Sequence, residues 1–182
     1  MDSSIRQKFN EFSSKEDKLR MDALQTILHI TDEKVDWVYE VWDELLQKLD
    51  DENSFQRSIA IMVLCNLAKS DDEKRMNTII DRLLRHTRDE KFITSRQCLQ
   101  NIWKVAAANP ELKETVVTHL EERYMNCVND KHYNLIRQDI LVSLQNISEN
   151  EIEKKLIDNI QRLLFLENDL KFRKKYEQVL KS

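Results

Sequence analysis

The sequence contains no glycine and a single proline among its 182 residues. A chain of this length with average composition would carry about 13 glycines. Glycine is the residue that adopts positive φ angles or admits a close backbone approach without steric cost. Its absence therefore excludes the phosphate-binding loop, the dinucleotide-binding turn and the nucleophile elbow, and it disfavours tight β-hairpins. The composition thus excludes most nucleotide-dependent enzymes and α/β hydrolases.

Metal-binding and redox motifs are also missing. Cys65, Cys98 and Cys127 form an odd set without the CxxC spacing of redox and zinc motifs, and we expect them to be reduced core residues. No histidine shares a helical i, i+4 face with a second histidine or a cysteine, as a helical zinc site would require. We therefore predict a protein that is not an enzyme, with no catalytic residue, bound metal, cofactor or small-molecule substrate.

Long hydrophobic runs are absent as well. No stretch approaches the ~18 uninterrupted apolar residues of a membrane-spanning helix. Residues 1–12 include Arg6 and Lys8 and lack the apolar region of a secretory signal peptide. We therefore expect a cytoplasmic protein that does not associate with a membrane.

What the sequence does contain is a helical pattern along nearly its whole length. Its content of 41% hydrophobic and 34% charged residues is too apolar for a disordered chain. Apolar residues recur at i, i+3, i+4 and i+7, and no stretch alternates as a half-buried strand would. The pattern predicts an all-α protein with a single domain over residues 1–182. The expected helices cover residues 3–12, 14–30, 33–49, 52–69, 71–87, 90–108, 110–127, 131–147, 149–166 and 169–181.

Local signals mark several of the expected helix starts. Ser-x-x-Glu sequences that begin at Ser13, Ser70 and Ser148 have the form of a capping box, in which the serine hydroxyl accepts a hydrogen bond from a backbone N–H of the first turn. Asn109 followed by Pro110 predicts another start, because a proline at the first helical position removes no helical hydrogen bond. The joins between the expected helices are very short.

The helices repeat as pairs about 40 residues long, which is the most specific signal in the chain. The pattern that begins at Arg20 returns at Arg57, Ser95 and Arg137. Its apolar positions are Ala23-Leu24 with Ile27, Ala60-Ile61 with Leu64, Cys98-Leu99 with Ile102, and Ile140-Leu141 with Leu144. A single pair of helices cannot bury its apolar face alone, so neighbouring pairs must stack. The predicted repeats are 13–50, 51–88, 89–129 and 130–167, followed by a C-terminal capping helix at 168–182.

These paired core residues, with the arginine that precedes three of them, resemble the repeats of the HEAT/armadillo family. The resemblance covers about residues 13–167. It implies a right-handed α-solenoid, an α-α superhelix of about four HEAT-like helix pairs with terminal capping helices. It also implies a concave surface, lined by the second helix of each pair, that holds a partner. We therefore expect a non-catalytic scaffold that binds a protein partner on its concave face.

Charge is distributed unevenly along the expected second helices. Residues 32–52 hold nine acidic and two basic residues, whereas residues 74–88 hold five basic residues and one acidic residue. Such a division favours a partner whose own charge reverses along its length. The candidate partner-binding residues are Arg82, Arg85, Arg123, Glu40, Asp43, Glu44 and Trp37.

Three alternatives remain open at this stage, and the least favoured of them is an enzyme whose side chains come together only through the curvature of the solenoid. The charged residues also fit a solvated helix face, which the arginine cluster by itself favours, because exposed ion pairs contribute little. A nucleic-acid-binding or DNA-repair-related protein is the third alternative, since some DNA glycosylases are built from HEAT-like repeats. The catalytic pattern of those glycosylases, a Trp with an Asp one helical turn along, is not found at Trp37, Trp42 or Trp103. A net charge of −4 also disfavours a large basic surface for DNA or RNA.

The last expected helix carries a cluster of basic residues with aromatic residues between them. A capping helix of a solenoid needs a polar outer face, which is the interpretation favoured here, although the cluster also fits an anionic surface. The basic residues are Lys171, Arg173, Lys174, Lys175 and Lys181.

Overall fold

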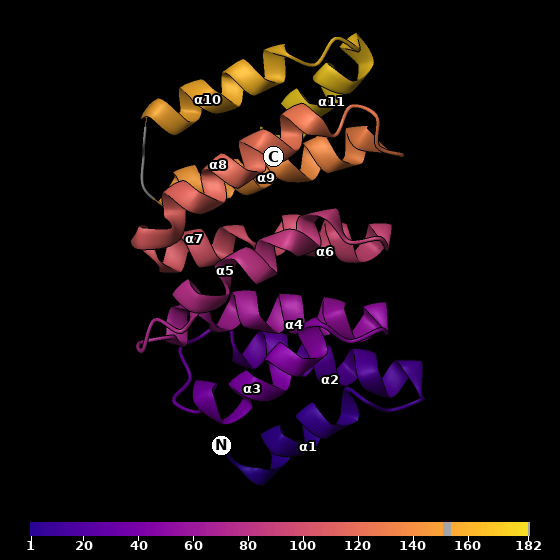
Figure 1. Ribbon diagram of the computed structural model, residues 1–182, viewed down its shortest axis with the longest axis vertical. Coiled ribbons are helices and arrows are strands. Elements are labelled where there is room, and N and C mark those ends of the chain that lie inside the picture. The colour runs from indigo at the N-terminus through magenta and orange to yellow at the C-terminus, as the bar shows by residue number, and fades with distance from the viewer. Residues whose placement is uncertain (151–153, 182) are drawn as a thin grey trace. The chain divides into compact units, whose positions relative to one another are not determined.

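The protein is all-α, as predicted from the sequence. A computed structural model describes residues 1–150 and 154–181, apart from the side chains of residues 149 and 150, and within these ranges it contains no strand. The α-helices are α1 (Ser3–Glu11), α2 (Asp17–Ile30), α3 (Val38–Leu49), α4 (Ser54–Leu67), α5 (Met76–Arg85), α6 (Phe92–Asn101), α7 (Trp103–Ala108), α8 (Pro110–Asn126), α9 (Tyr133–Asn150), α10 (Lys154–Phe165) and α11 (Leu170–Val179) (Figure 1). Short 3-10 helices, η1 (Ala68–Ser70) and η2 (His86–Arg88), follow α4 and α5. No helix in the described ranges is both long enough and apolar enough to cross a membrane.

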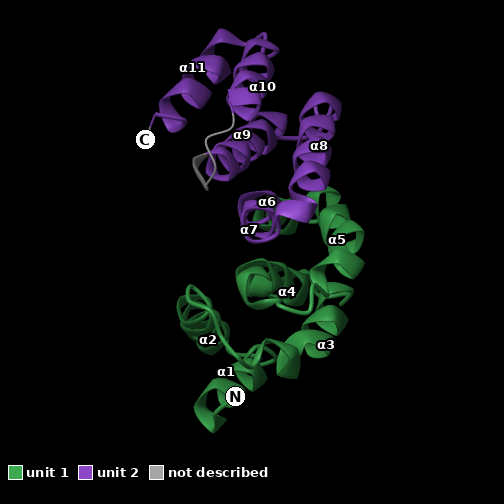
Figure 2. Ribbon diagram, turned by 90° about the vertical axis from the view of Figure 1, so that its left-hand side faces the viewer, with its two compact units in different colours: residues 1–98 green, residues 99–182 purple. Residues whose placement is uncertain are grey.

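The chain divides into two compact units, Met1–Cys98 and Leu99–Ser182 (Figure 2). The division falls inside α6, so the predicted repeat at 89–129 contributes residues to both units. Each of the other three predicted repeats contains two helices at the expected places.

In the first unit, α4 is the central helix. Helix α2 packs on one side of it, and α3 and α5 lie on the other side (Figure 2). Helix α1 packs against α2. The repeated pairs Ala23-Leu24 and Ala60-Ile61 are buried in this core, as predicted, because they lie on the faces that the helices turn toward each other.

In the second unit, α9 is the central helix. Helices α7 and α8, which precede α9 in the chain, pack against it and against each other. Helices α10 and α11, which follow α9 in the chain, also pack against it. The repeated pair Ile140-Leu141 is buried on α9, as predicted. The helix expected over 90–108 is broken at Ile102, where the Val105 N–H donates to the Ile102 carbonyl in a tighter, 3-10-like turn.

The predicted helix starts are only partly confirmed. Helix α8 begins at Pro110 as expected, but the Asn109 side chain makes no cap to it. Helix α5 begins at Met76, because the Asp71 carboxylate rather than Ser70 accepts from the N–H groups of Arg75 and Met76. The capping box at Ser13 is also wrong, because α2 begins at Asp17 and the Ser13 hydroxyl contacts Lys48. Ser148 lies inside α9, and Glu151, its expected partner, lies outside the described residues.

All three cysteines are buried and reduced, as predicted. Burial raises the pKa of the Cys98 thiol, which keeps it protonated and unreactive. Trp42 is a core residue, whereas Trp103 is half-buried with the Lys104 ammonium over its ring.

Candidate interaction surfaces

Two of the seven candidate partner-binding residues are buried. Trp37 is 6% exposed and stands edge-to-face against Phe9 of α1, with 5.8 Å between the ring centres. Arg123 is 3% exposed, and its guanidinium donates to the Asp130 carboxylate at 2.5 Å. The expectation that Trp37 and Arg123 contact a partner is therefore corrected. Neither side chain is accessible, because each completes the packing of its own unit.

Three further candidates are accessible but are bonded within the chain. The Met1 ammonium pairs with Glu40 at 2.6 Å, and Arg6 of α1 pairs with Glu44 at 3.0 Å. Arg82 of α5 reaches back to α3, where it pairs with Asp50 at 2.6 Å and donates to the Leu46 carbonyl. The acidic side of α3 is thus covered in part by the Met1 ammonium and by Arg6 of α1.

The remaining two candidates, Asp43 and Arg85, are exposed on α3 and α5. Among the described residues neither makes a hydrogen bond or an ion pair. Both lie on the solvent side of the helices that carry them, because their neighbours Trp42 and Leu84 are turned into the core. Asp43 and Arg85 are therefore the predicted residues that remain available to a partner.

Helices α3 and α5 are fixed to each other at both ends. At the beginning of α3, the Tyr39 hydroxyl donates to Asp71 at 2.9 Å, and the Arg75 guanidinium lies 4.4 Å from the centre of the Tyr39 ring. At the other end, Arg82 makes the contacts to Asp50 and Leu46 described above. Because equivalent ends are joined, the two helices run side by side in the same direction. Burial raises the pKa of the Tyr39 hydroxyl, which stays protonated as a hydrogen-bond donor.

The solvent side of this helix pair is called the α3–α5 face, and its residues are Glu40, Asp43, Gln47, Asp81 and Arg85. All five are exposed. The acids lie in the first two-thirds of each helix, and Arg85 closes α5, with exposed Arg88 just beyond it. Within these five residues, the charges are therefore acidic toward the start of the helices and basic only at Arg85. The predicted change of sign along the stack of helices stays a prediction.

The arginine that begins three of the repeats has a structural role that the sequence did not reveal. Arg57 donates through Nε and Nη2 to both carboxylate oxygens of Asp89, each at 2.8 Å. Its Nη1 donates to the carbonyls of Asp51 and Glu52. The Arg57 and Asp89 side chains are 9% and 4% exposed. Arg57 thus joins the start of α4 to the segment that follows α5.

Arg137 repeats this arrangement in the second unit. Its Nη1 donates to Glu167 at 2.9 Å, and both side chains are buried. The guanidinium lies 4.5 Å from the centre of the Tyr124 ring and 5.3 Å from that of Tyr133. The Tyr176 hydroxyl of α11 donates to the same Glu167 carboxylate at 3.4 Å. Arg137 and Glu167 therefore hold α9, the end of α10 and α11 together.

The Arg57–Asp89 pair makes stability depend on pH. Burial raises the pKa of Asp89, but hydrogen bonds from Arg57, the Lys91 amide and His86 lower it to about 2, against 3.8 without these contacts. Because the folded-state pKa is the lower one, this stabilisation is complete above pH 4 and is lost as the pH falls toward 2.

We expect the unfolding free energy of the wild type to exceed that of Asp89→Asn by about 2 kcal/mol more at pH 6 than at pH 2. Urea unfolding of both proteins across this range measures the difference, and groups that titrate alike in both cancel from it. A difference that stays constant from pH 6 to pH 2 would show that Asp89 is not held by these contacts.

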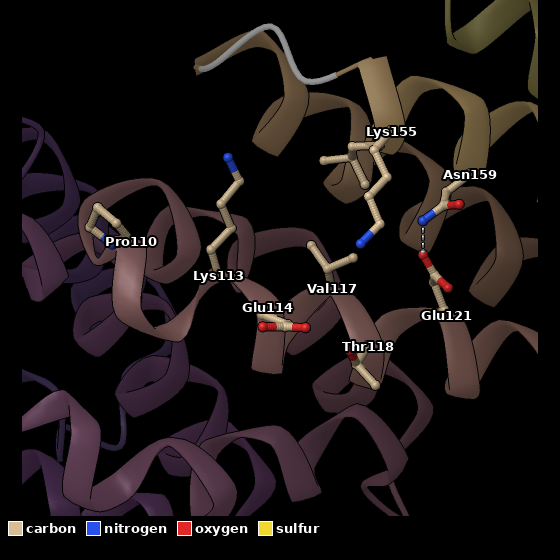
Figure 3. A pocket seen from close by; sticks show the side chains of 9 residues that line it. Pro110, Lys113, Glu114, Val117, Thr118, Glu121, Lys155 and Asn159 are labelled. Atoms are coloured by element: carbon tan, nitrogen blue, oxygen red, sulfur yellow. Dashed lines mark hydrogen bonds between the residues drawn. The ribbon is translucent and has the colours of Figure 1, made fainter.

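An open cavity of about 450 Å³ lies in the second unit between α8 and α10 (Figure 3). Lys113 of α8 and Lys155 of α10 extend into it from its two walls, and Val117 and Leu156 form its apolar part. Glu121 at one end accepts from Asn159 at 2.7 Å and from Arg162 at 3.1 Å. The cavity is thus lined by lysines and carboxylates together, so its charge does not favour a ligand of either sign.

Sequence reasoning did not identify this cavity, although one signal was present. The repeat spacing that aligns Glu44 with Arg82 also aligns Glu121 with Asn159, the two residues joined across the cavity. Among the described residues, no three His, Cys, Asp or Glu side chains come close enough together to hold a metal ion.

Of the comparisons with known proteins, the comparison with solved structures gave matches. No family model and no curated protein matches the chain. Among solved structures, the chain is similar to the crystal structure of an engineered protein from the Northeast Structural Genomics Consortium. That similarity covers 98% of this chain and 78% of the engineered chain, with 14% sequence identity and a TM-score of 0.58. At this identity the likeness concerns the fold alone, which is all-helical.

Proposed function

We propose that this protein is a non-catalytic, cytoplasmic α-solenoid of HEAT-like repeats that binds a protein partner on the surface of its second helices. The paired helices at 13–50, 51–88 and 130–167 support the repeat architecture, as do the buried core pairs that recur in them. The recurring arginine supports it too, because Arg57 and Arg137 make the same kind of contact in different repeats.

One observation carries the choice of surface. The α3–α5 face presents exposed charges of both signs on two helices that are fixed to each other at both ends. Asp43 and Arg85 use none of their hydrogen-bonding capacity within the described part of the chain. A rigid surface with unused, oriented charges loses little conformational entropy when a partner binds. Fixed charges of both signs also select the orientation of that partner.

The partner that fits this face is an extended or helical segment whose charge reverses along its length. Its basic part would lie near Asp43, and its acidic part would receive the Arg85 guanidinium. The pairing of Arg6 with Glu44 supports this assignment, because it is a contact of the same kind made by the chain's own α1. Arginine binds a carboxylate through two parallel hydrogen bonds, which adds geometric selectivity.

Charge reversal tests the proposal. We expect Arg85→Glu combined with Asp43→Lys to reduce recovery of the protein partner about tenfold or more in an affinity pull-down from cell lysate. The net charge of the double variant equals that of the wild type, so any loss reflects the arrangement of the charges. Lysate treated with nuclease separates direct protein binding from recovery through nucleic acid.

Lys18→Glu combined with Asp22→Lys is the matched control, because both residues are exposed on α2, away from the α3–α5 face. We expect this control to retain the partner. Equal recovery with both double variants would contradict the assigned surface. Recovery that depends on intact nucleic acid would replace the proposal with the nucleic-acid-binding alternative.

A further inference from the structure

The corner where α10 passes into α11 exposes an unusual amount of apolar surface. Phe165 is 68% exposed and Leu170 66% exposed, and Leu166 between them is also exposed. Beside Phe165, a hollow of about 410 Å³ opens between α10 and α11, lined by apolar Leu164 and Leu180 together with Gln161, Glu177 and Lys181. It is called the corner hollow below. The hollow is open to solvent, and its volume admits one bulky side chain.

One lysine lines the corner hollow and a second lies near it. Lys174 and Glu177 share one face of α11 with Leu170, because they follow it at i+4 and i+7, and Lys181 lines the hollow just beyond the end of the helix. Lys174 and Lys181 are exposed and, within the described residues, make no ion pair. Of the nearby acids, Glu167 is bound to Arg137, and the Asp169 carboxylate caps the first turn of α11. Among the described residues, Glu177 is the carboxylate on this side of α11, against Lys174 and Lys181, and exposed Asp158 lies on α10 one turn before Gln161.

The walls of the corner hollow are held in place before any ligand arrives. Arg173 donates to the carbonyls of Phe165 and Glu167, and its guanidinium lies 5.7 Å from the centre of the Phe165 ring. On the inner side of α11, Phe172 stands edge-to-face against Tyr133, and Tyr176 is buried. Because these contacts already hold the backbone around the exposed apolar groups, a ligand can bind to them with little loss of conformational entropy.

We propose that the corner hollow binds an acidic segment of another protein, with one bulky apolar side chain inserted beside Phe165 and flanking carboxylates paired with Lys174 and Lys181. A protein segment fits better than a lipid surface or a nucleic acid, since the site is concave and Glu177 lies within it. Both of those surfaces are extended and densely anionic, and neither would insert an apolar side chain beside Phe165 while keeping its own charges away from Glu177. The site lies in the second compact unit and is independent of the α3–α5 face.

Fluorescence anisotropy with the intact protein tests the proposal. The probe is a fluorescein-labelled peptide of about 15 residues with Leu and Phe on one helical face and Glu beside them. We expect it to bind, and we expect Lys174→Glu/Lys181→Glu to weaken binding about tenfold or more and Phe165→Ser about fivefold. Circular dichroism melts show whether each variant is folded.

The matched control is Lys171→Glu/Lys175→Glu, which makes the same change of charge on the neighbouring face of the same helix. We expect it to weaken binding by less than about threefold. An equal loss in the two double variants would overturn the site, since it would indicate general attraction to a basic helix. The proposal is likewise overturned if the peptide does not bind, or if phosphatidylserine vesicles or a single-stranded oligonucleotide bind in its place.

Discussion

Replacing Glu167 by alanine is expected to destabilise the second compact unit by about 3–5 kcal/mol, because a buried guanidinium then loses its counter-charge. In the wild type, Arg137 donates to Glu167 while lying against the rings of Tyr124 and Tyr133. These rings stabilise a cation but do not replace a carboxylate acceptor. The change also removes the acceptor of the Tyr176 hydroxyl and so loosens α11.

Urea unfolding followed by circular dichroism measures this effect. Arg162→Ala is the control in the same unit, because Arg162 is 56% exposed and its pair with Glu121 is expected to contribute less than about 1 kcal/mol. Glu167→Gln should fall between the two, since it keeps a hydrogen-bond acceptor and loses the charge. A loss below about 1 kcal/mol for Glu167→Ala would mean that Arg137 finds other compensation.

Arg57→Ala is expected to have an effect of the same size in the first unit, about 3–5 kcal/mol. The substitution leaves the Asp89 carboxylate, 4% exposed, without its bidentate partner, and it removes the donor to the carbonyls of Asp51 and Glu52. A single substitution thus leaves two backbone carbonyls and one carboxylate without this hydrogen-bond donor.

Arg20 provides the comparison, because it occupies the same position in the preceding repeat. It pairs with Asp17, whose side chain is 91% exposed, and donates to the Ser14 carbonyl. We expect Arg20→Ala to cost less than about 1 kcal/mol. Chemical denaturation of both variants makes the comparison, and similar losses would show that burial of the ion pair does not determine its contribution.

The sequence was sufficient to predict the helices and the core because both depend on local periodicity. Ala23-Leu24, Ala60-Ile61 and Ile140-Leu141 lie on buried faces at the predicted spacing. The start of α3 was less predictable. Helix α3 begins at Val38 rather than near residue 33, since Trp37 turns inward onto Phe9, a contact between residues far apart in the sequence.

The candidate site was harder to predict, because accessibility depends on which ion pairs form. The sequence placed Arg82 and Arg85 together as equivalent charges on one helix. In the structure Arg82 is occupied by Asp50 and Leu46, and Arg85 is left to solvent. Likewise, the repeated arginine was visible as a pattern, but its partner Asp89 lies 32 residues away and could be identified only in three dimensions.

The measurement that tests the proposed function most directly is site-specific photo-crosslinking from Gln47. This residue is exposed on the α3–α5 face, one helical turn beyond Asp43, and the repeat spacing aligns it with Arg85. With a benzophenone amino acid at position 47, nuclease-treated lysate should give one discrete protein adduct, which Arg85→Glu/Asp43→Lys abolishes. The same photo-reactive group at Lys18 on α2 should give no such adduct. Identical adducts from both positions, or none from position 47, would contradict a protein-binding role for this face.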